Sequence, residues 1–541
     1  MKKHDQIKLN KKKDPDVKTF PVPSDLEDIK KEGIISLNTI SNDSKEQIIN
    51  HALKLHSQGK ILEASKYYQY IINQGFQDHR VFSNYGVILK NLGKLKEAEL
   101  SLRKAIELMP NFEEAYYNLG NVLNDLGKAQ EAFDSHLKVI EINPIFPNIY
   151  TSLVRLIKDL NLSLLNKSKL EDILNILLER DNVPHNELLK AFYFLYRKEI
   201  IINLEGLESD FSKIELVINK KIIINALKKM ILKDLRLEKS LTKIREKLCN
   251  MISTNKNINC SQLEFLIALA EQCFLNEYIY SLSKEENISI NIILKKCRDG
   301  ELNETNISIL SCYFPLYKLL NQIPLLKSFN SSNKSIIELI KSQISEPLKE
   351  IQLSKSIKKL GNINEITSQI VKSQYEDNPY PKWKFGNESQ ALKTNPIIAI
   401  NAEIKPNSLS SNFNSNQLRV LIAGCGTGLQ ILDAQRYKDS KITGIDLSLP
   451  SLAYAQRKIN ELKSNNVELI QMDILEVDLL EEKFDIIECG GVLHHMDHPS
   501  KGLQALLGVL KKNGFLKLGL YSELARQKIV EARNYISRKK L

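Results

Sequence analysis

Apolar and polar positions alternate with helical spacing from residue 46 to about residue 154, and small residues mark this pattern at a fixed period. Three series keep one and the same step along the chain: Gly59, Gly93 and Gly127; Ala64, Ala98 and Ala132; and Pro110 and Pro144. The glycines suit left-handed turns between two helices, and the alanines allow those helices to pack closely. Proline ends the second helix of each unit. The pattern therefore predicts repeated helical hairpins.

This pattern resembles the tetratricopeptide repeat, whose period is the step that these three series keep. Gly86 and Gly120 fit the small residue that is packed between the helices of each unit. The first unit has Ala52 at that glycine position and Phe76 at the proline position, and Val154 lies one full period after Gly120. Such departures are typical of the ends of a repeat array. The resemblance implies an all-α solenoid with a groove that binds a protein or peptide partner.

Two further segments surround these repeats. Residues 1–45 are polar and rich in lysine and proline, which predicts a flexible tail. Residues 155–370 carry apolar residues at helical spacing, for example Leu189, Phe192 and Leu195. We expect helices there that extend the solenoid or pack between its ends, and no motif indicates their role.

A connector at residues 371–416 holds the only tryptophan, Trp383, and two prolines that flank Tyr380. Proline restricts its own backbone and that of the preceding residue, which predicts an extended, stiff segment. Its aromatic residues either line the mouth of a binding site or dock the helical part onto the next domain. The rest of the connector is polar and rich in asparagine and serine.

Residues 417–541 change to short apolar runs that alternate with helical stretches, which indicates a doubly wound, Rossmann-like parallel sheet. The strands are predicted at Leu418–Ala423, Lys441–Asp446, Val467–Gln471, Phe484–Glu488 and Phe515–Leu520. The run from Leu510 to Gly514 predicts a turn with a positive φ at the glycine.

The first strand leads into Gly424, Gly426 and Gly428, which are separated by Cys425 and Thr427. Glycine permits a tight turn and a close approach of the backbone to a ligand. A nicotinamide-binding fingerprint requires its third glycine one position later, where this chain has Leu429. The spacing therefore disfavours a nicotinamide oxidoreductase.

Acidic residues follow at the ends of the next strands. Asp446 ends the second strand, Asp473 follows the third, and Glu488 ends the fourth. A carboxylate at the tip of the second strand can accept hydrogen bonds from both hydroxyls of a ribose. We expect Asp485, earlier in the fourth strand, to be structural.

In this order and at these intervals, residues 418 to about 525 resemble a class I S-adenosylmethionine-dependent methyltransferase. The resemblance implies a cofactor site in which the glycine loop cradles the methionine and ribose, the second strand binds the ribose, the third the adenine, and the fourth forms the floor under the methyl group. Its residues are Gly424, Cys425, Gly426, Thr427, Gly428, Asp446, Leu447, Asp473, Ile474, Glu488 and Gly490. The acidic residue that this family often places two positions before the first glycine is absent, because Ile422 stands there.

His494 and His495 are the candidate catalytic residues, because histidine titrates near neutral pH and can accept a proton from the methyl acceptor. We expect these adjacent side chains to face different sides, so that at least one is packed or solvated. A sheet of this class has seven strands, but only a helical stretch from Glu523 to about Tyr535 follows Tyr521. We therefore expect the last two strands to be missing and the fifth to form an exposed edge.

Composition narrows the classes of function. The net charge of +11 is the difference between 76 basic and 65 acidic residues that are mixed along the chain, which does not favour nucleic-acid binding. Seven cysteines without a CxxC pair indicate reduced thiols and no zinc or other metal site. The sequence has no apolar signal segment and no uninterrupted apolar stretch of membrane-spanning length, so we expect a cytoplasmic protein without a membrane anchor.

The sequence thus predicts a multidomain protein with a tetratricopeptide solenoid, a helical middle region and a methyltransferase domain. Our leading hypothesis is a methyltransferase whose repeats recruit a partner or a large substrate. The alternative is an interaction scaffold that carries a catalytically silent fold. The sequence does not indicate the methyl acceptor.

Overall fold

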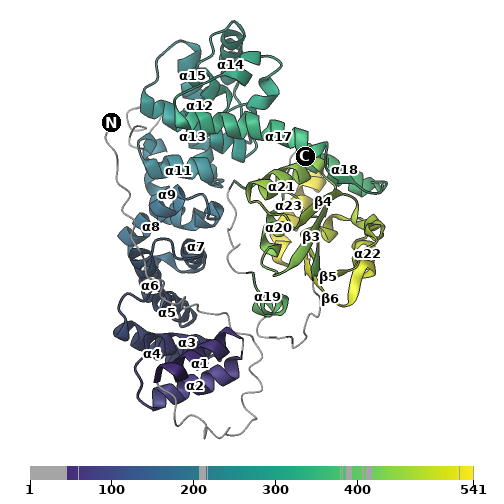
Figure 1. Ribbon diagram of the computed structural model, residues 1–541. Coiled ribbons are helices and arrows are strands. Elements are labelled where there is room, and N and C mark those ends of the chain that lie inside the picture. The colour runs from purple at the N-terminus through teal and green to yellow at the C-terminus, as the bar shows by residue number, and fades with distance from the viewer. Residues whose placement is uncertain are drawn as a thin grey trace, which may run out of the picture. The chain divides into compact units, whose positions relative to one another are not determined.

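The computed structural model describes residues 45–539 except 59, 206–214, 216, 378, 380–381, 385–392, 405–406, 408, 410–416 and 523. These residues form two compact units, one up to Asn166 together with 397–412, and one of 167–396 together with the residues from 413 onward (Figure 1). The predicted tail up to residue 44, Gly59 and Tyr380 lie outside the described residues.

The first unit contains three successive helical hairpins. Their helices are α1 (Lys45–Ser57), α2 (Ile61–Asn73), α3 (His79–Asn91), α4 (Leu95–Leu108), α5 (Glu113–Asp125) and α6 (Ala129–Ile142), followed by α7 (Ile149–Asp159) and η2 (Leu162–Leu164). First helices begin at residues 45, 79 and 113 and second helices at 61, 95 and 129, so both sets keep the period of the sequence pattern. The described part of residues 397–412 contains most of α19 (Pro396–Glu403).

Small residues set the spacing of these hairpins. Gly93 and Gly127 connect the two helices of their units with φ values of 74° and 75°, as predicted. A Cβ atom on Gly86 would lie 2.7 Å from Cγ of Leu102, so a side chain there would push α3 and α4 apart. The same restriction applies at Gly120, where a Cβ atom would overlap the imidazole of His136.

The second unit begins with helices, as predicted for the middle region. They are α8 (Lys167–Glu179), η3 (His185–Leu188), α9 (Leu189–Glu205), α11 (Lys221–Lys229), α12 (Leu235–Ser253), α13 (Cys260–Leu275), α14 (Lys284–Arg298), α15 (Glu304–Leu310), η4 (Leu316–Leu319), η5 (Pro324–Ser328), α16 (Lys334–Ile340), η6 (Lys341–Ser345), α17 (Glu346–Ser354) and α18 (Ile366–Asp377). Arg245 on α12 and Glu286 on α14 form an ion pair in which the side chains are only 2% and 1% exposed.

A six-stranded sheet completes this unit, with the strand order β1-β4-β3-β2-β5-β6 and parallel pairing throughout. The strands are β1 (Lys358–Lys359), β2 (Leu418–Ala423), β3 (Ser440–Asp446), β4 (Val467–Gln471), β5 (Phe484–Gly490) and β6 (Leu510–Gly519). β1 corrects the prediction of a purely helical middle region, since two lysines of that region pair with Ile470 and Gln471 on β4.

The predicted turn from Leu510 to Gly514 was wrong, because these residues begin β6. Leu510 pairs with Phe484 and Phe515 pairs with Ile486, so the additional residues of β6 bulge opposite a single position of β5. Gly514 does not adopt a positive φ. It is needed for close approach instead, since a Cβ atom there would lie 2.9 Å from the carbonyl oxygen of Asp485.

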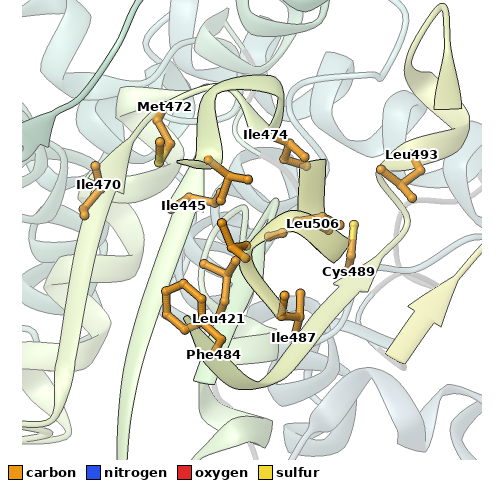
Figure 2. Packing of buried hydrophobic residues seen from close by; sticks show 13 residues of the cluster. Leu421, Ile445, Ile470, Met472, Ile474, Phe484, Ile487, Cys489, Leu493 and Leu506 are labelled. Atoms are coloured by element: carbon orange, nitrogen blue, oxygen red, sulfur yellow. The ribbon is translucent and has the colours of Figure 1, made fainter. Parts of the chain in front are cut away.

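Helices cover both faces of the sheet. Figure 2 shows the core on one face, where Leu421, Ile445 and Phe484 from the strands pack with Leu506 of α22 (Pro499–Val509). η8 (Ile474–Leu480) contributes to the same core. α20 (Leu429–Ala434) and α21 (Leu449–Glu461) contact strands β2, β3 and β4 from the other face.

β6 lies at one end of the sheet, as predicted for the last strand. Its final residues and the segment beyond it are exposed, including Leu518, Leu520 and Tyr521. η10 (Leu524–Arg526) and α23 (Gln527–Lys539) follow, and none of the described residues of α23 is buried. Among the described residues, no helix combines the length and the apolar character that crossing a bilayer requires.

Candidate functional site

The strand order reverses direction between β2 and β5. From β2 the chain passes to β3 and β4 on one side, and then returns to β5 and β6 on the other. Ligands of open α/β sheets bind outside the carboxyl ends of the strands at such a reversal. The predicted glycine loop and the tips of β3, β4 and β5 all lie at this edge of the sheet.

The loop after β2 has a conformation that only glycine adopts readily. Gly424, Gly426 and Gly428 have φ values of 74°, 50° and 91°. A Cβ atom on Gly424 would overlap the side chain of Val492, and one on Gly428 would lie 2.8 Å from Cβ of Ala455. Glycine is therefore required here for both backbone conformation and space.

Hydrogen bonds tie this loop to β3. The amides of Gly424 and Cys425 both donate to the carbonyl oxygen of Ile445, at 2.9 and 3.0 Å. The Cys425 side chain is buried, and burial raises the pKa of its thiol well above the usual range. Cys425 is therefore a protonated packing residue at neutral pH, and only its backbone is available to a ligand.

Asp446 points toward the glycine loop. Its Oδ2 accepts a hydrogen bond from the Gly426 amide at 2.8 Å, and its Oδ1 accepts one from the Ser448 amide at 2.9 Å. Burial raises the pKa of the Asp446 carboxyl, although these amides and that of Leu447 favour the ionised form. Each oxygen has a further lone pair, so the carboxylate is still able to accept hydrogen bonds from a diol.

The residues after β4 are buried and make contacts within the fold. Asp473 is 4% exposed, and its Oδ1 caps η8 by accepting a hydrogen bond from the Leu475 amide at 3.0 Å. Ile474 belongs to the core beneath the sheet. The carbonyl oxygen of Leu447 accepts a hydrogen bond from Nε2 of Gln471 at 2.8 Å, which joins the tips of β3 and β4.

The Glu488 carboxylate is held by neighbouring side chains. Its Oε1 accepts hydrogen bonds from Nη2 of Arg436 at 2.6 Å and from the hydroxyl of Tyr437 at 2.8 Å. Gly490, two residues later, accepts a hydrogen bond on its carbonyl oxygen from Nε2 of Gln430 at 3.0 Å. Sequence reasoning missed Arg436, Tyr437 and Gln430, because no motif marks a side chain that acts through tertiary contact.

His494 and His495 lie together, which corrects the prediction that they diverge. Their Nε2 atoms are 3.2 Å apart, and the ring of His494 stacks on Tyr521 with 3.6 Å between the ring centroids. A short helical turn, η9 (Leu493–His495), and the ring of Tyr521 bring the two imidazoles to one place. Partial burial lowers the pKa of both histidines, and neighbouring positive charge, including that of Arg526, lowers it further. Both imidazoles are therefore neutral at pH 7.

Asp485 and Trp383 were also singled out from the sequence. Asp485 accepts hydrogen bonds from the Arg419 amide and from Nζ of Lys511, each at 2.9 Å, near the opposite end of β5, and its contacts are structural as predicted. Trp383 of the connector is buried, and its Nε1 donates to the carbonyl oxygen of Thr427 in the glycine loop at 3.0 Å.

Comparison with known proteins finds family matches for two stretches of the chain. Residues 421–518 match the methyltransferase domain family, and residues 86–127 and 113–146 match tetratricopeptide repeat families. An uncharacterized protein of Synechococcus sp. is 36% identical over 121 residues, which are 22% of this chain and 29% of that protein. The tRNA U34 carboxymethyltransferase of Campylobacter curvus is 31% identical over 20% of this chain and 37% of its own length. The ubiquinone biosynthesis O-methyltransferase of Pseudomonas fluorescens is 31% identical over 22% of this chain and 50% of its own length.

The chain thus spans half or less of each of these three relatives. Each of these relatives aligns with less than a quarter of this chain, so none of them represents the whole protein. The parallel sheet with its glycine loop and the helical hairpins agree with the family matches. The chain combines tetratricopeptide repeats with a methyltransferase domain, and the cofactor that this domain implies is S-adenosyl-L-methionine.

Proposed function

We propose that this chain is an S-adenosylmethionine-dependent methyltransferase whose tetratricopeptide repeats recruit a protein partner or a large substrate. The observation that carries the proposal is the hydrogen bond between Asp446 and the Gly426 amide. It places a carboxylate at the tip of one strand beside a glycine bend at the tip of its neighbour. A ribose that lies over the bend is then within reach of the carboxylate.

The residues at this edge fit the cofactor. Gly424, Gly426 and Gly428 carry no side chains, and the side chains of Cys425 and Thr427 between them are buried, so a ligand can approach the backbone of this bend. Asp446 has the lone pairs to bind both ribose hydroxyls. The neighbouring Leu447, Asp473 and Ile474 complete the ribose and adenine side, as the resemblance implies. The Glu488 carboxylate already accepts hydrogen bonds from Arg436 and Tyr437. We therefore assign the floor of the methyl site to the backbone from Glu488 to Gly490.

The bound cofactor supplies an electrophilic methyl group on a sulfonium. The protein's contribution is to align the acceptor with that methyl and to exclude competing arrangements. If the acceptor carries a proton, we assign its removal to His494 or His495, because the lowered pKa values keep both imidazoles neutral and able to accept a proton. Their Nε2 atoms face each other, so we assign the proton to the pair rather than to one residue.

The repeats support the second part of the proposal. Tetratricopeptide arrays bury their helices against one another and leave an extended concave surface. The first unit contains a hollow of about 210 Å³ between α3, α4 and α5, lined by Lys90, Asn91, Asn118 and Asn121 together with apolar residues. These polar side chains suit recognition of a peptide, whose backbone offers both donors and acceptors.

Isothermal titration with S-adenosylmethionine tests the cofactor assignment. We expect saturable heat with the wild-type chain and at least about a hundredfold weaker binding by Asp446→Ala, because two hydrogen bonds to a charged acceptor are each worth about 1.5–3 kcal/mol. Asp478→Ala is the matched control, since Asp478 is an exposed acid in η8 near the same edge. Circular dichroism checks that both variants fold. Absence of heat from the wild type would favour the scaffold hypothesis, and equal binding by Asp446→Ala would refute the site.

A further inference from the structure

The sequence allows the connector either to line a site or to dock two parts of the chain, and Trp383 contacts groups of both kinds. Its Nε1 donates a buried hydrogen bond to the Thr427 carbonyl in the glycine loop, at 3.0 Å. Its ring packs with Leu432 of α20, Tyr454 of α21 and Leu462 just after α21. The indole nitrogen therefore makes a directional hydrogen bond, whereas the rest of the ring makes apolar packing contacts.

The main chain next to the indole is fixed as well. The hydroxyl of Tyr454 donates to the carbonyl oxygen of Trp383, and Nζ of Lys458 donates to the carbonyl oxygen of Lys384 at 2.9 Å. The same ammonium group lies 5.3 Å from the centroid of the Trp383 ring. Burial lowers the pKa of Lys458, which is consistent with an ammonium that has little access to water.

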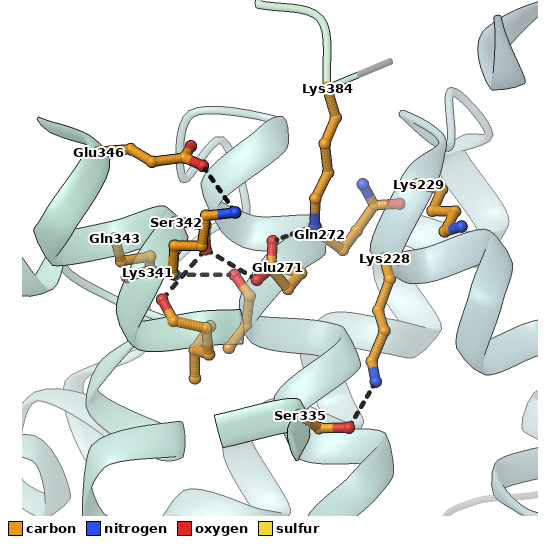
Figure 3. Close-up of polar contacts among 12 residues, drawn as sticks. Lys228, Lys229, Glu271, Gln272, Ser335, Lys341, Ser342, Gln343, Glu346 and Lys384 are labelled. Carbon is orange, nitrogen blue, oxygen red and sulfur yellow. Dashed lines mark hydrogen bonds and ion pairs between the residues drawn. The ribbon is translucent and has the colours of Figure 1, made fainter. Parts of the chain in front are cut away.

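The two lysines that flank Trp383 reach in the other direction, to helix α13 and the residues just after it. Nζ of Lys384 pairs with Glu271 at 3.2 Å, and Nζ of Lys382 pairs with Glu277 at 3.7 Å. Glu271 is a firm attachment, because its side chain is 3% exposed and also accepts a hydrogen bond from Ser342 at 2.8 Å (Figure 3). Three consecutive residues therefore join the glycine loop to the helical part of this unit.

The Thr427 carbonyl belongs to the glycine-rich part of the loop. It stands between Gly426 and Gly428, both in the left-handed region, and glycine has more accessible backbone conformations than any other residue. Asp446 restrains the loop at the Gly426 amide, and Trp383 restrains it at the Thr427 carbonyl, two peptide groups further on. With both restraints the loop is ordered before a ligand arrives, and a preformed site loses less entropy on binding.

We propose that Trp383 is a positioning residue for the cofactor loop, and that Lys382 and Lys384 tie it to the end of helix α13. This inference rests on the proposed function, since it concerns the same cofactor. Trp383 acts through Thr427 and needs no contact with the cofactor. The affinity for the cofactor then depends on an indole N–H and on a helix that lies outside the methyltransferase domain.

Trp383→Phe tests the indole bond, because phenylalanine keeps an aromatic ring and removes the N–H donor. We expect S-adenosylmethionine to bind about tenfold more weakly to this variant by isothermal titration, as expected for one net hydrogen bond. Leu462→Ala is the matched control, since it loosens the same packing and leaves the bond intact. It should keep wild-type affinity even if its unfolding midpoint falls as far as that of Trp383→Phe.

The attachment to α13 has a separate readout. Trp383 is the only tryptophan of the chain, so its emission reports on this contact alone. In the wild type, its emission should change on titration with S-adenosylmethionine and saturate at the calorimetric Kd. Lys384→Met should weaken cofactor binding, whereas Lys341→Met, which removes an exposed lysine near the same helices, should not.

The outcomes separate the two proposals. Equal affinities of the wild type and Trp383→Phe would overturn the positioning role and leave the cofactor site standing. Equal losses in Trp383→Phe and Leu462→Ala would also overturn it, because packing alone would then explain both. A wild-type chain that binds no cofactor would overturn the proposed function and this inference together.

Discussion

Gly424→Ala tests how tightly the glycine loop is fitted to the end of β5. Gly424 has a φ of 74°, and a Cβ atom there would overlap the side chain of Val492. Left-handed backbone costs a residue with a side chain about 1–2 kcal/mol, and overpacking costs about 1–3 kcal/mol more. We therefore expect the free energy of unfolding of the methyltransferase part to fall by about 2–5 kcal/mol. Gly491 is a matched control, because its φ is 78° and a Cβ atom there would meet no heavy atom within 4 Å.

Urea unfolding, followed by circular dichroism, measures both effects. Gly491→Ala should lose only the strain, about 1–2 kcal/mol. A double-mutant cycle with Val492→Ala isolates the overlap, since removing both γ-methyl groups of Val492 gives the new methyl room. The cycle should show a favourable coupling of about 1–3 kcal/mol. Equal losses at positions 424 and 491, or the absence of coupling to Val492, would refute this account of the loop.

Three further predictions concern pH and a buried ion pair. Burial lowers the pKa of His56 to about 4, so the folded state resists its protonation, and His56 alone should lower the free energy of unfolding by about 3 kcal/mol from pH 7 to pH 4; in urea unfolding, His56→Gln should lose about 3 kcal/mol less than the wild type over this range, and the exposed His51→Gln should lose as much as the wild type. Burial raises the pKa of Asp446, so calorimetry should show cofactor affinity falling on acidification at a pH above the usual aspartate range, and a flat profile would contradict this. Arg245→Met leaves the buried carboxylate of Glu286 without its ion-pair partner, and denaturation should show a loss of about 3–5 kcal/mol, whereas a loss under about 1 kcal/mol would contradict the pairing.

The sequence predicted those parts of the fold that depend on local spacing. The regular steps that include Gly93 and Gly127 predicted the hairpin turns, because a left-handed turn between two helices requires glycine whatever surrounds it. The strands before Gly424 and through Asp446 followed from short apolar runs that are buried on both faces of a parallel sheet. These features are determined by a few neighbouring residues.

Features that depend on distant partners were missed. Lys358 and Lys359 carry no apolar pattern, and they form a strand only because the edge of β4 offers them backbone partners. Gly514 matched a turn, but the bulge against β5 decides its conformation. Trp383 belongs to a segment whose stiffness is predictable, yet its partner, the Thr427 carbonyl, is far along the chain and has no sequence signal.

Asp446 and Glu488 show why the site itself was only partly predictable. Both are acids at or near the carboxyl ends of parallel strands that flank β2, so their spacing alone predicts a ligand contact for each of them. The partners of Asp446 are backbone amides, which the glycine loop and the residues after β3 supply. The partners of Glu488 are Arg436 and Tyr437, whose side chains reach it only because the chain after α20 returns to β5. An acid at a strand end therefore remains available to a ligand where its partners are backbone amides, because these leave lone pairs free. It is not available where a guanidinium binds it and neutralises its charge.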